Sequence, residues 1–441
     1  MVTVPTRVRL GYAVGSFCTA NFTTIPGLLL LIYMTNVLAV DPLLAGVVVF
    51  LPKAWDLVAN TLVGQWSDRT VSRWGPRRPW LLGGAAILPI AFVVMFIGPP
   101  LTGGAAALFV GLAFLVAASG YALYEVPYKA MPAEMTHDYH ERTSLLQWRM
   151  IFIAIGIGMS GILAPILAGD TVEGYRLMGL VFGVILLLAM LASFFGTAGA
   201  PYTGQAEPEV SLRAQLRAAR TSRPFMWLLG LSSAQTLGAY VMLAGAPYFA
   251  AYTVGSTGAT TTLFAALVGP MLVTMPLWVW LARKLDKRGA MILSGVLFMS
   301  GAVAAVATPL FGPLYAHAVI VVVGVGYAGL QLLQFSMLAD VIAYDGQVSG
   351  KRRGGVFTGL WTAVESAVAA FGATIYGATL AIGGFRESDP ANPVTQPESA
   401  EFAVLIGITV VPAAIILLGV LMTFKYDLTS AKMSQVSHDV T

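Results

Sequence analysis

Five ionisable side chains lie in stretches of the sequence that are otherwise almost entirely apolar: Lys53, Asp56, Glu125, Arg149 and Glu365. Placing such a side chain at the centre of a lipid bilayer costs about 2.5–3.5 kcal/mol on insertion scales. Residues kept at that cost usually line a pathway for an ion or a polar solute. These positions are therefore candidates for ion coupling or for substrate binding.

Lys53, Asp56 and Asn60 share one face of a predicted helix, because they are spaced three and four residues apart. A carboxylate beside an amide carbonyl could coordinate a hard cation, and Asp56 could instead carry a proton. The alternative is a permanent Lys53–Asp56 ion pair that only neutralises both charges. We favour a coupling role, since an ion pair alone does not recover the cost of insertion.

Glu125 and Arg149 lie on two predicted helices joined by one short loop, so we expect the two helices to be neighbours. An arginine and a carboxylate together grip the paired hydroxyls of a polyhydroxylated ligand well. Tyr121 and Tyr128 flank Glu125 at helical spacing and join it as candidate substrate residues. The alternative is that the Glu125–Arg149 pair is only a strut between helices.

Glu365 is the only charge in the middle of a predicted span in the second half of the chain, and Trp361 lies one turn before it. It has no basic partner in that half, which favours a protonated state or a partner across a cavity. Gln331 is a further candidate for substrate contact. For Gln334 and Gln235 we favour hydrogen bonds between helices.

The composition is that of a multi-pass membrane protein. Of 441 residues, 57% are hydrophobic and 10% are charged, and the formal net charge is +4, with a mean hydropathy of +0.78. This excludes typical soluble enzymes and nucleic-acid-binding proteins. The two GxGxxG patterns, at 156–161 and 324–329, follow no strand, so we expect helix packing rather than nucleotide binding, and no cofactor.

Twelve stretches are long and apolar enough to cross a bilayer as helices. They are 11–39, 42–65, 80–100, 105–128, 143–168, 177–198, 225–253, 258–282, 291–309, 314–339, 355–383 and 402–424. With this segmentation, 21 of the 25 Lys and Arg residues fall on one side of the membrane. Positive charge is retained in the cytoplasm, so both termini are expected there, with the chain in the cell (inner) membrane.

The longest loop, 199–224, divides the chain into an N-terminal six-helix bundle, 1–198, and a C-terminal bundle with a short tail, 225–441. Charged loops recur after the second and fourth spans of each half. We therefore expect an all-α membrane protein of two pseudo-symmetric bundles that rock around a site between them. The charged loops would form a cytoplasmic gate. Its residues are Asp68, Arg69, Arg73, Arg78, Glu134, Arg142, Asp340 and Arg353.

Four segments carry a family resemblance that extends over nearly the whole chain. They resemble the glycoside-pentoside-hexuronide:cation symporters, a family of the major facilitator superfamily that includes the melibiose carrier. The segments are KAWDLVANTLVGQWSDRT (53–70) with RWGPRRPW (73–80), VPYKAMPAEMTHDYHERT (126–143), MLADVIAYD (337–345), and KRRG (351–354) with Trp361.

The resemblance implies roles for single positions. It places Asp56 at a cation-site carboxylate with Lys53 as its basic neighbour, Glu125 at the sugar-binding acid and Arg149 at the arginine of the fifth span. Departures from the family pattern weaken a sodium site, because Asn60 replaces a second aspartate. At the sugar site, Ala20 replaces an aspartate, with Asn21 adjacent, Gln331 replaces an aromatic residue, and Glu365 stands where a lysine is common.

The sequence thus predicts a transporter, not an enzyme, that moves a sugar or glycoside with H⁺ or Na⁺ by alternating access. A first alternative keeps the fold but carries an amphiphile, such as a lysolipid, an organic acid or a steroid-like compound. A second alternative is a membrane-embedded enzyme that uses Glu125 or Glu365 as an acid or base. The expected partners are the small-molecule substrate and the bilayer, with no nucleic acid, no obligate protein partner and a monomeric chain.

Overall fold

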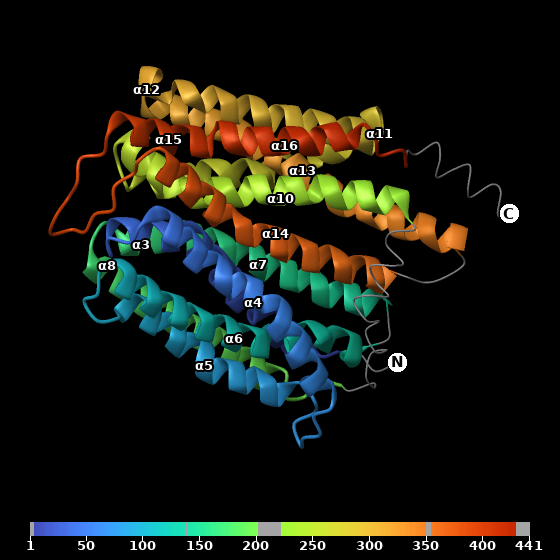
Figure 1. Ribbon diagram of the computed structural model, residues 1–441. Coiled ribbons are helices and arrows are strands. Elements are labelled where there is room, and N and C mark those ends of the chain that lie inside the picture. The colour runs from blue at the N-terminus through green and yellow to red at the C-terminus, as the bar shows by residue number, and fades with distance from the viewer. Residues whose placement is uncertain (1–3, 137–138, 202–221, 350–353, 429–441) are drawn as a thin grey trace. The chain divides into compact units, whose positions relative to one another are not determined.

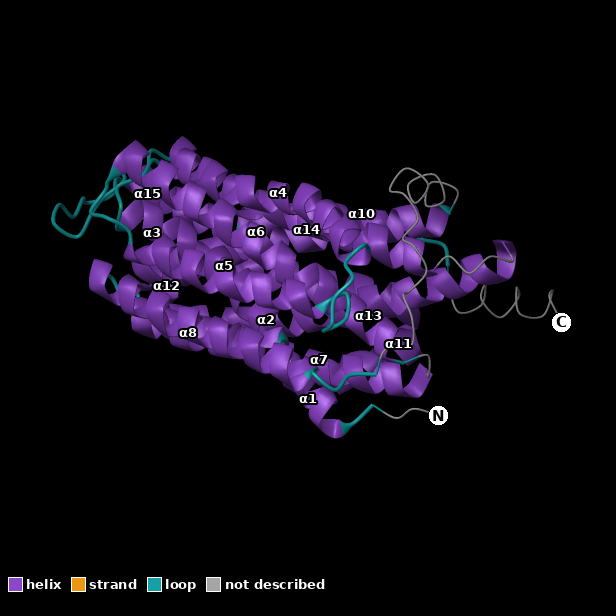
Figure 2. Ribbon diagram, turned by 90° about the horizontal axis from the view of Figure 1, so that it is seen from below, coloured by secondary structure: helices purple, strands orange, loops and turns teal. Residues whose placement is uncertain are grey.

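A computed structural model describes residues 4–136, 139–201, 222–349 and 354–428, and in these ranges helices are joined by loops and turns without a β-strand (Figure 2). Helices suit an apolar chain in lipid, because each backbone N–H and C=O finds its partner within the same segment. The described chain divides into two compact units, each treated by itself below. Unit 1 comprises 1–207 and 384–397, and unit 2 comprises 208–383 and 398–441.

Unit 1 contains six spans in chain order, of which the first is built from several short helices (Figure 1). Its helices are α1 (Thr6–Val14), α2 (Ser16–Ile25), the π-helical turn η1 (Pro26–Leu30), α3 (Leu31–Asn36), α4 (Pro42–Asp68), α5 (Arg78–Ile97), α6 (Gly103–Met135), α7 (Tyr139–Ala168) and α8 (Val172–Gly196). Helix α6 packs against α4 and α5, and α2 packs against α7 and α8.

Unit 2 repeats this plan. Its elements are α10 (Arg223–Tyr248), the π-helical turn η2 (Phe249–Val254), α11 (Ala259–Ala304), the 3₁₀ turn η3 (Ala305–Ala307), α12 (Thr308–Phe311), α13 (Pro313–Ser349), α14 (Gly354–Ile382), α15 (Glu398–Ile408) and α16 (Val410–Thr423). Helix α10 packs against α14 and α16, as α2 does against α7 and α8, and α11 packs along α13. A π-helical turn follows the first helices of both units, which strengthens the pseudo-symmetry.

Two spans run together through α11. Eleven helical stretches of the described chain are long and apolar enough to span a membrane, and one of them, Ala259–Phe311, has 53 residues. At about 1.5 Å per residue it is more than twice as long as a hydrocarbon core of about 30 Å. Asp286 breaks it, with φ 61° and ψ 159°, so this stretch makes two crossings. Counting it twice gives the twelve predicted spans.

Close helix packing explains the two GxGxxG patterns. A Cβ atom on Gly326 would lie 2.5 Å from the backbone nitrogen of Phe298, and one on Gly156 would lie 2.6 Å from the Cβ of Ala20. Such approaches between backbones are what small residues permit in membrane helices. The expectation of helix packing is confirmed for Gly156, Gly324, Gly326 and Gly329, whereas a Cβ atom on Gly158 would meet nothing within 4 Å.

The loop 384–397 connects α14 to α15 (Figure 1). It belongs to unit 1. The backbone nitrogen of Ser388 donates to the carbonyl of Thr35 at 2.9 Å, and the nitrogen of Ala39 donates to the carbonyl of Ser388 at 3.1 Å. Within the loop, the amide of Gln396 donates to the carbonyl of Arg386 at 2.7 Å and accepts from its backbone nitrogen at 2.9 Å. The loop is therefore held by backbone hydrogen bonds to the end of α3.

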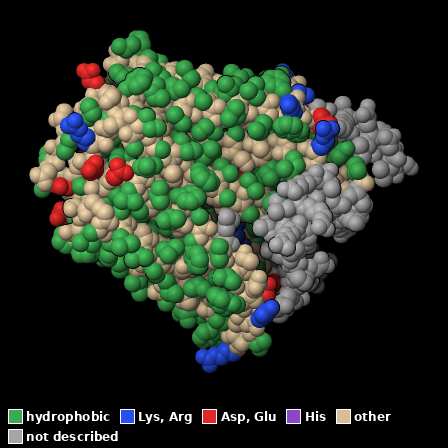
Figure 3. Space-filling model, in the orientation of Figure 1, with side chains coloured by type: hydrophobic (Ala, Val, Ile, Leu, Met, Phe, Trp, Pro, Cys, Tyr) green, Lys and Arg blue, Asp and Glu red, His purple; other side chains and the backbone are tan. Residues whose placement is uncertain are grey.

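Hydrophobic side chains cover most of the face seen in Figure 3, and the visible Lys, Arg, Asp and Glu side chains gather toward the ends of the helices. This distribution fits helices whose middle portions face lipid and whose ends face water. Charged side chains away from the helix ends are then the exception, and they define the candidate sites.

Candidate functional site

Glu125 is the centre of a charged cluster in unit 1, and its side chain is only 3% exposed. One carboxylate oxygen accepts a hydrogen bond from the hydroxyl of Thr19 at 2.6 Å. The other oxygen receives Lys129 at 3.0 Å and Arg149 at 3.3 Å. Helices α2, α6 and α7 therefore meet at this carboxylate, and the predicted neighbourhood of Glu125 and Arg149 is observed.

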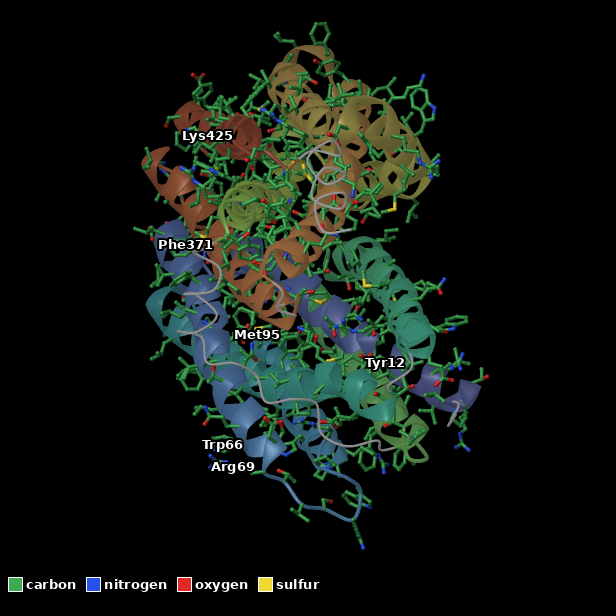
Figure 4. All side chains as sticks on the ribbon, turned by 90° about the vertical axis from the view of Figure 1, so that its right-hand side faces the viewer. Tyr12, Trp66, Arg69, Met95, Phe371 and Lys425 are labelled. Carbon is green, nitrogen blue, oxygen red and sulfur yellow. The ribbon has the colours of Figure 1, made fainter. Side chains whose placement is uncertain are left out.

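A stack of aromatic rings positions this cluster. The ring of Tyr128 stacks on Tyr12 with centroids 4.5 Å apart and on Tyr124 at 5.3 Å. The Tyr128 hydroxyl donates to the carbonyl of Tyr12 at 2.6 Å and lies 2.8 Å from the hydroxyl of Ser16, which must then donate to it. The guanidinium of Arg149 lies 5.8 Å from the Tyr128 ring centroid, within reach of a cation–π interaction. The position of Tyr12, one ring of this stack, is labelled in Figure 4.

The cluster around Glu125 contains one hydrogen-bond donor without a partner and one more positive charge than negative charge. The Nε atom of Arg149 is buried without a hydrogen-bond partner. Two cations, Lys129 and Arg149, face the single carboxylate of Glu125. A buried N–H without a partner costs about 1–3 kcal/mol, so a ligand oxygen placed there would gain a strong, charge-assisted hydrogen bond.

The predicted coupling residues lie on α4. Asp56 is buried, and its Oδ1 atom has no hydrogen-bond partner. Lys53 makes no ion pair with it within 4.0 Å, and its ammonium lies 5.7 Å from the ring centroid of Phe22. The charges of Lys53 and Lys129 nevertheless act on Asp56. Asn60 is exposed, although it shares the helix face of Asp56. The alternative of a closed Lys53–Asp56 bridge is thus not the observed arrangement.

Two other predicted substrate residues of unit 1 are buried. Asn21 is fully buried, where its amide nitrogen donates to the carbonyl of Phe17 at 2.6 Å and its oxygen accepts from Ser160 at 2.6 Å. The bond from Ser160 connects α7 to α2. Tyr121 packs on Phe22, with ring centroids 4.7 Å apart. Asn21 is therefore already satisfied by the protein, and its substrate role stays a prediction.

In unit 2, Glu365 on α14 is half-buried and bonded to hydroxyls of α10. It accepts from Ser232 at 3.0 Å and from Thr236 at 3.4 Å. Ser232 also lies 3.0 Å from the amide oxygen of Gln334, which is the interhelical hydrogen bond expected for that residue. No ion pair to Glu365 occurs among the described residues.

The remaining predicted residues of unit 2 lie around this carboxylate. Trp361 is buried one turn before Glu365, with its ring 6.4 Å from that of Phe335. Gln331 donates to the hydroxyl of Tyr327 at 2.5 Å. Gln235 donates to the sulfur of Met291 at 3.2 Å, so it contacts α11, as an interhelical role requires.

Arg77 organises the loop between α4 and α5, where the sequence had indicated its neighbour Arg78. It pairs with Glu134 at 2.6 Å and with Asp68 at 2.6 Å, and it donates to the hydroxyl of Ser67 at 2.7 Å. Burial lowers the pKa of Arg77, but the bonds to Glu134 and Asp68 raise it and prevail, so its pKa lies above the usual value. Arg78 instead donates to the carbonyl of Phe194 at 2.9 Å.

Unit 2 has a smaller counterpart of this cluster, in which Lys287 pairs with Asp340 at 2.6 Å. Of the other predicted gate residues, Arg69 caps the end of α4 near Trp66 (Figure 4). Arg73 lies 4.9 Å from the ring centroid of Trp74. Arg353 and the side chain of Arg142 lie outside the described residues. The gating role of all these residues stays a prediction.

Sequence reasoning missed several members of these clusters. Lys129 could have been found, since it follows Glu125 by four residues on the same helix. Ser232 and Thr236 are also four residues apart, so their hydroxyls lie on one face of α10. Thr19 carries no comparable signal, because it lies 106 residues from its partner Glu125.

Comparison with known proteins identifies the family of the chain. A family model described as MFS/sugar transport protein matches residues 11–430. The glucuronide carrier protein homolog of Escherichia coli (strain K12) is 23% identical, over 98% of this chain and 94% of that protein. The sodium-dependent lysophosphatidylcholine symporter 1 of Gallus gallus is 21% identical, over 96% of this chain and 87% of that protein.

Among solved structures, a bacterial homolog of the human lysosomal transporter Spinster, in an inward-facing and unoccupied conformation, has a TM-score of 0.71. It is 16% identical and covers 96% of this chain and 98% of its own, so it supports the fold alone. The family match over nearly the whole chain, the two six-helix units and the intramembrane charges lead to one assignment. The chain belongs to the MFS/sugar transport protein family, and it is a multi-pass membrane transporter of the major facilitator superfamily, not an enzyme.

Proposed function

We propose that the protein is a symporter that moves a sugar or glycoside with a cation by alternating access. The observation that carries this proposal is the Glu125–Arg149 pair, in which a buried guanidinium nitrogen has no partner within the protein. A planar guanidinium beside a carboxylate offers both donors and acceptors to neighbouring hydroxyls. The buried, stacked rings of Tyr12 and Tyr128 support Arg149, whose guanidinium lies 5.8 Å from the Tyr128 ring centroid.

We further propose that the coupling ion is a proton and that Asp56 carries it. Its buried carboxylate has an oxygen without a hydrogen-bond partner, and a proton bound there would remove the cost of burying a charge. Burial of Asp56 favours its neutral, protonated form over a charged carboxylate. Asn60 supplies an amide oxygen where a strong site for a hard cation would need a further carboxylate.

The setting that fits these roles is the cell (inner) membrane, with both termini in the cytoplasm, as the distribution of Lys and Arg indicates. Both six-helix units come from one chain. A single copy therefore supplies all the elements of a transporter of this class, and we propose that the protein works as a monomer.

Transport into proteoliposomes tests the proposal. A panel of radiolabelled sugars, glycosides and uronides is offered under an imposed pH gradient, a sodium gradient, or neither. We expect sugar uptake that rises with the pH gradient, that Asp56→Asn abolishes accumulation but retains exchange, and that Arg149→Ala weakens substrate binding. Accumulation that is unchanged in Asp56→Asn would refute the coupling role, and an unchanged Kd in Arg149→Ala would make that residue a strut.

A second candidate cargo is an anionic or zwitterionic amphiphile. The excess positive charge of Lys129 and Arg149 over Glu125 would complement a phosphate group, and the similarity to a lysophosphatidylcholine symporter points the same way. Lysophosphatidylcholine offered beside the sugars separates the two cargos. Saturable uptake of the lysolipid without uptake of any sugar would replace the first proposal by the second.

A further inference from the structure

A chain of polar side chains crosses unit 2 through three helices and ends at Glu365. The amide of Gln331 donates to the hydroxyl of Tyr327 at 2.5 Å, and the amide of Gln334 donates to the oxygen of Gln331. The hydroxyl of Ser232 lies 3.0 Å from the Gln334 oxygen and 3.0 Å from the Glu365 carboxylate. The chain thus runs from α13 through α10 to α14.

The number of hydrogens in this chain depends on the protonation of Glu365. A serine hydroxyl has one hydrogen to donate, but Ser232 faces two acceptors, the amide oxygen of Gln334 and the carboxylate. If Glu365 is ionised, Ser232 donates to it, and the buried Gln334 oxygen loses its donor. If Glu365 carries a proton, that proton is donated to Ser232, which donates in turn to Gln334. Every bond is then satisfied.

The surroundings of Glu365 leave it free to exchange a proton. The titratable groups that act on it are two phenols, Tyr240 on α10 and Tyr327 on α13. No Lys, Arg or His of the described residues is among the groups that act on it. Helix α15, which also packs against α14, carries Glu398 and Glu401 in its first turn, close to the other end of α14. Within the described residues, Glu365 thus lacks the cationic partners that Glu125 has in unit 1.

We propose that Glu365 is a proton-binding site, and that the Ser232 hydroxyl switches between Glu365 and Gln334 as the proton leaves and returns. Its part in coupling rests on the proton symport proposed above, whereas the binding of the proton does not. This site lies in unit 2 and is separate from Asp56 in unit 1. A transporter with one protonatable carboxyl group in each unit could couple proton binding to movements of both units.

The test is residue-specific labelling of the intact protein in detergent micelles. A hydrophobic carbodiimide reacts with protonated carboxyl groups, and mass spectrometry reports the labelled fraction of Glu365 as a function of pH. We expect labelling to fall as the pH rises through a midpoint. Ser232→Ala should move that midpoint up by about one pH unit, a tenfold change in proton affinity, because hydrogen bonds to a charged group are stronger than those to a neutral one.

Two variants control the measurement. Ser233→Ala removes a hydroxyl that donates to the carbonyl of Leu229 in its own helix, so it should leave the midpoint unchanged. Glu365→Gln should remove a titrating carboxyl band from the infrared difference spectrum, and Asp56→Asn should retain that band. Labelling that does not vary with pH, or a midpoint that is the same in Ser232→Ala and the wild type, would overturn the proposal. Substrate uptake that does not change with the pH gradient would refute proton symport but not proton binding at Glu365.

Discussion

Arg77 provides a quantitative test of how unit 1 is held together at its loop between α4 and α5. Its side chain is 8% exposed and that of Glu134 is 4% exposed, with the guanidinium and the carboxylate 2.6 Å apart. Removing one partner of a buried ion pair costs about 3–5 kcal/mol, because the other charge loses its compensation. Arg77→Met should therefore lower the free energy of unfolding by that amount.

The second acid of the cluster should matter far less. The side chain of Asp68 is 55% exposed, and exposed ion pairs contribute about 0–1 kcal/mol. Asp68→Asn should thus cost no more than about 1 kcal/mol. The double variant Arg77→Met with Glu134→Met replaces the buried pair by apolar side chains, and such replacements are often neutral. Its loss should be well below the sum of the two single losses.

Denaturant titration of the purified protein in detergent, followed by tryptophan fluorescence, measures these free energies. Arg73→Met is the control, because Arg73 is exposed and should change stability by less than about 0.5 kcal/mol. Equal losses in Arg77→Met and Asp68→Asn would contradict the burial argument. Additive losses in the double variant would show that Arg77 and Glu134 are not energetically coupled.

Two further predictions concern unit 2. Gly326→Ala should destabilise the protein by about 1–3 kcal/mol, because its Cβ would meet the backbone of Phe298. The control is Gly346→Ala in the same helix, whose Cβ would meet nothing within 4 Å, so that this variant should be neutral or stabilising. Thermal unfolding of both variants compares them directly. Lys287→Met should cost about 0.2–1 kcal/mol, since Lys287 and Asp340 are 33% and 29% exposed; a loss that persists at high salt would contradict a screened surface pair.

The spans could be predicted from hydropathy alone, but their ends could not. The predicted span 105–128 becomes α6, Gly103–Met135, because the helix continues past the apolar stretch. Helix ends in water are set by capping and local contacts rather than by hydropathy. The sequence prediction separated the two spans within α11 correctly. The break itself depends on the backbone conformation of Asp286, which the amino-acid composition does not reveal.

The candidate sites were predictable where partners lie close in sequence. Glu125 and Arg149 belong to consecutive helices, so connectivity alone brought them together. The choice of Arg77 over Arg78 as the ion-pairing residue could not be made in that way, because adjacent residues at a helix start point in directions about 100° apart. Whether a side chain faces Glu134 or Phe194 depends on how α5 is rotated against α6 and α8, and packing at a distance in sequence determines that rotation.

The two intramembrane glutamates, Glu125 and Glu365, are held by different kinds of partner. Glu125 receives two cations and a hydroxyl, so its charge is compensated within the protein. Glu365 accepts from the hydroxyls of Ser232 and Thr236, and no described cation forms an ion pair with it. A hydroxyl can donate to a carboxylate or accept from a carboxylic acid without moving. The first environment suits a fixed binding surface for a polar cargo, and the second suits a group that changes its charge.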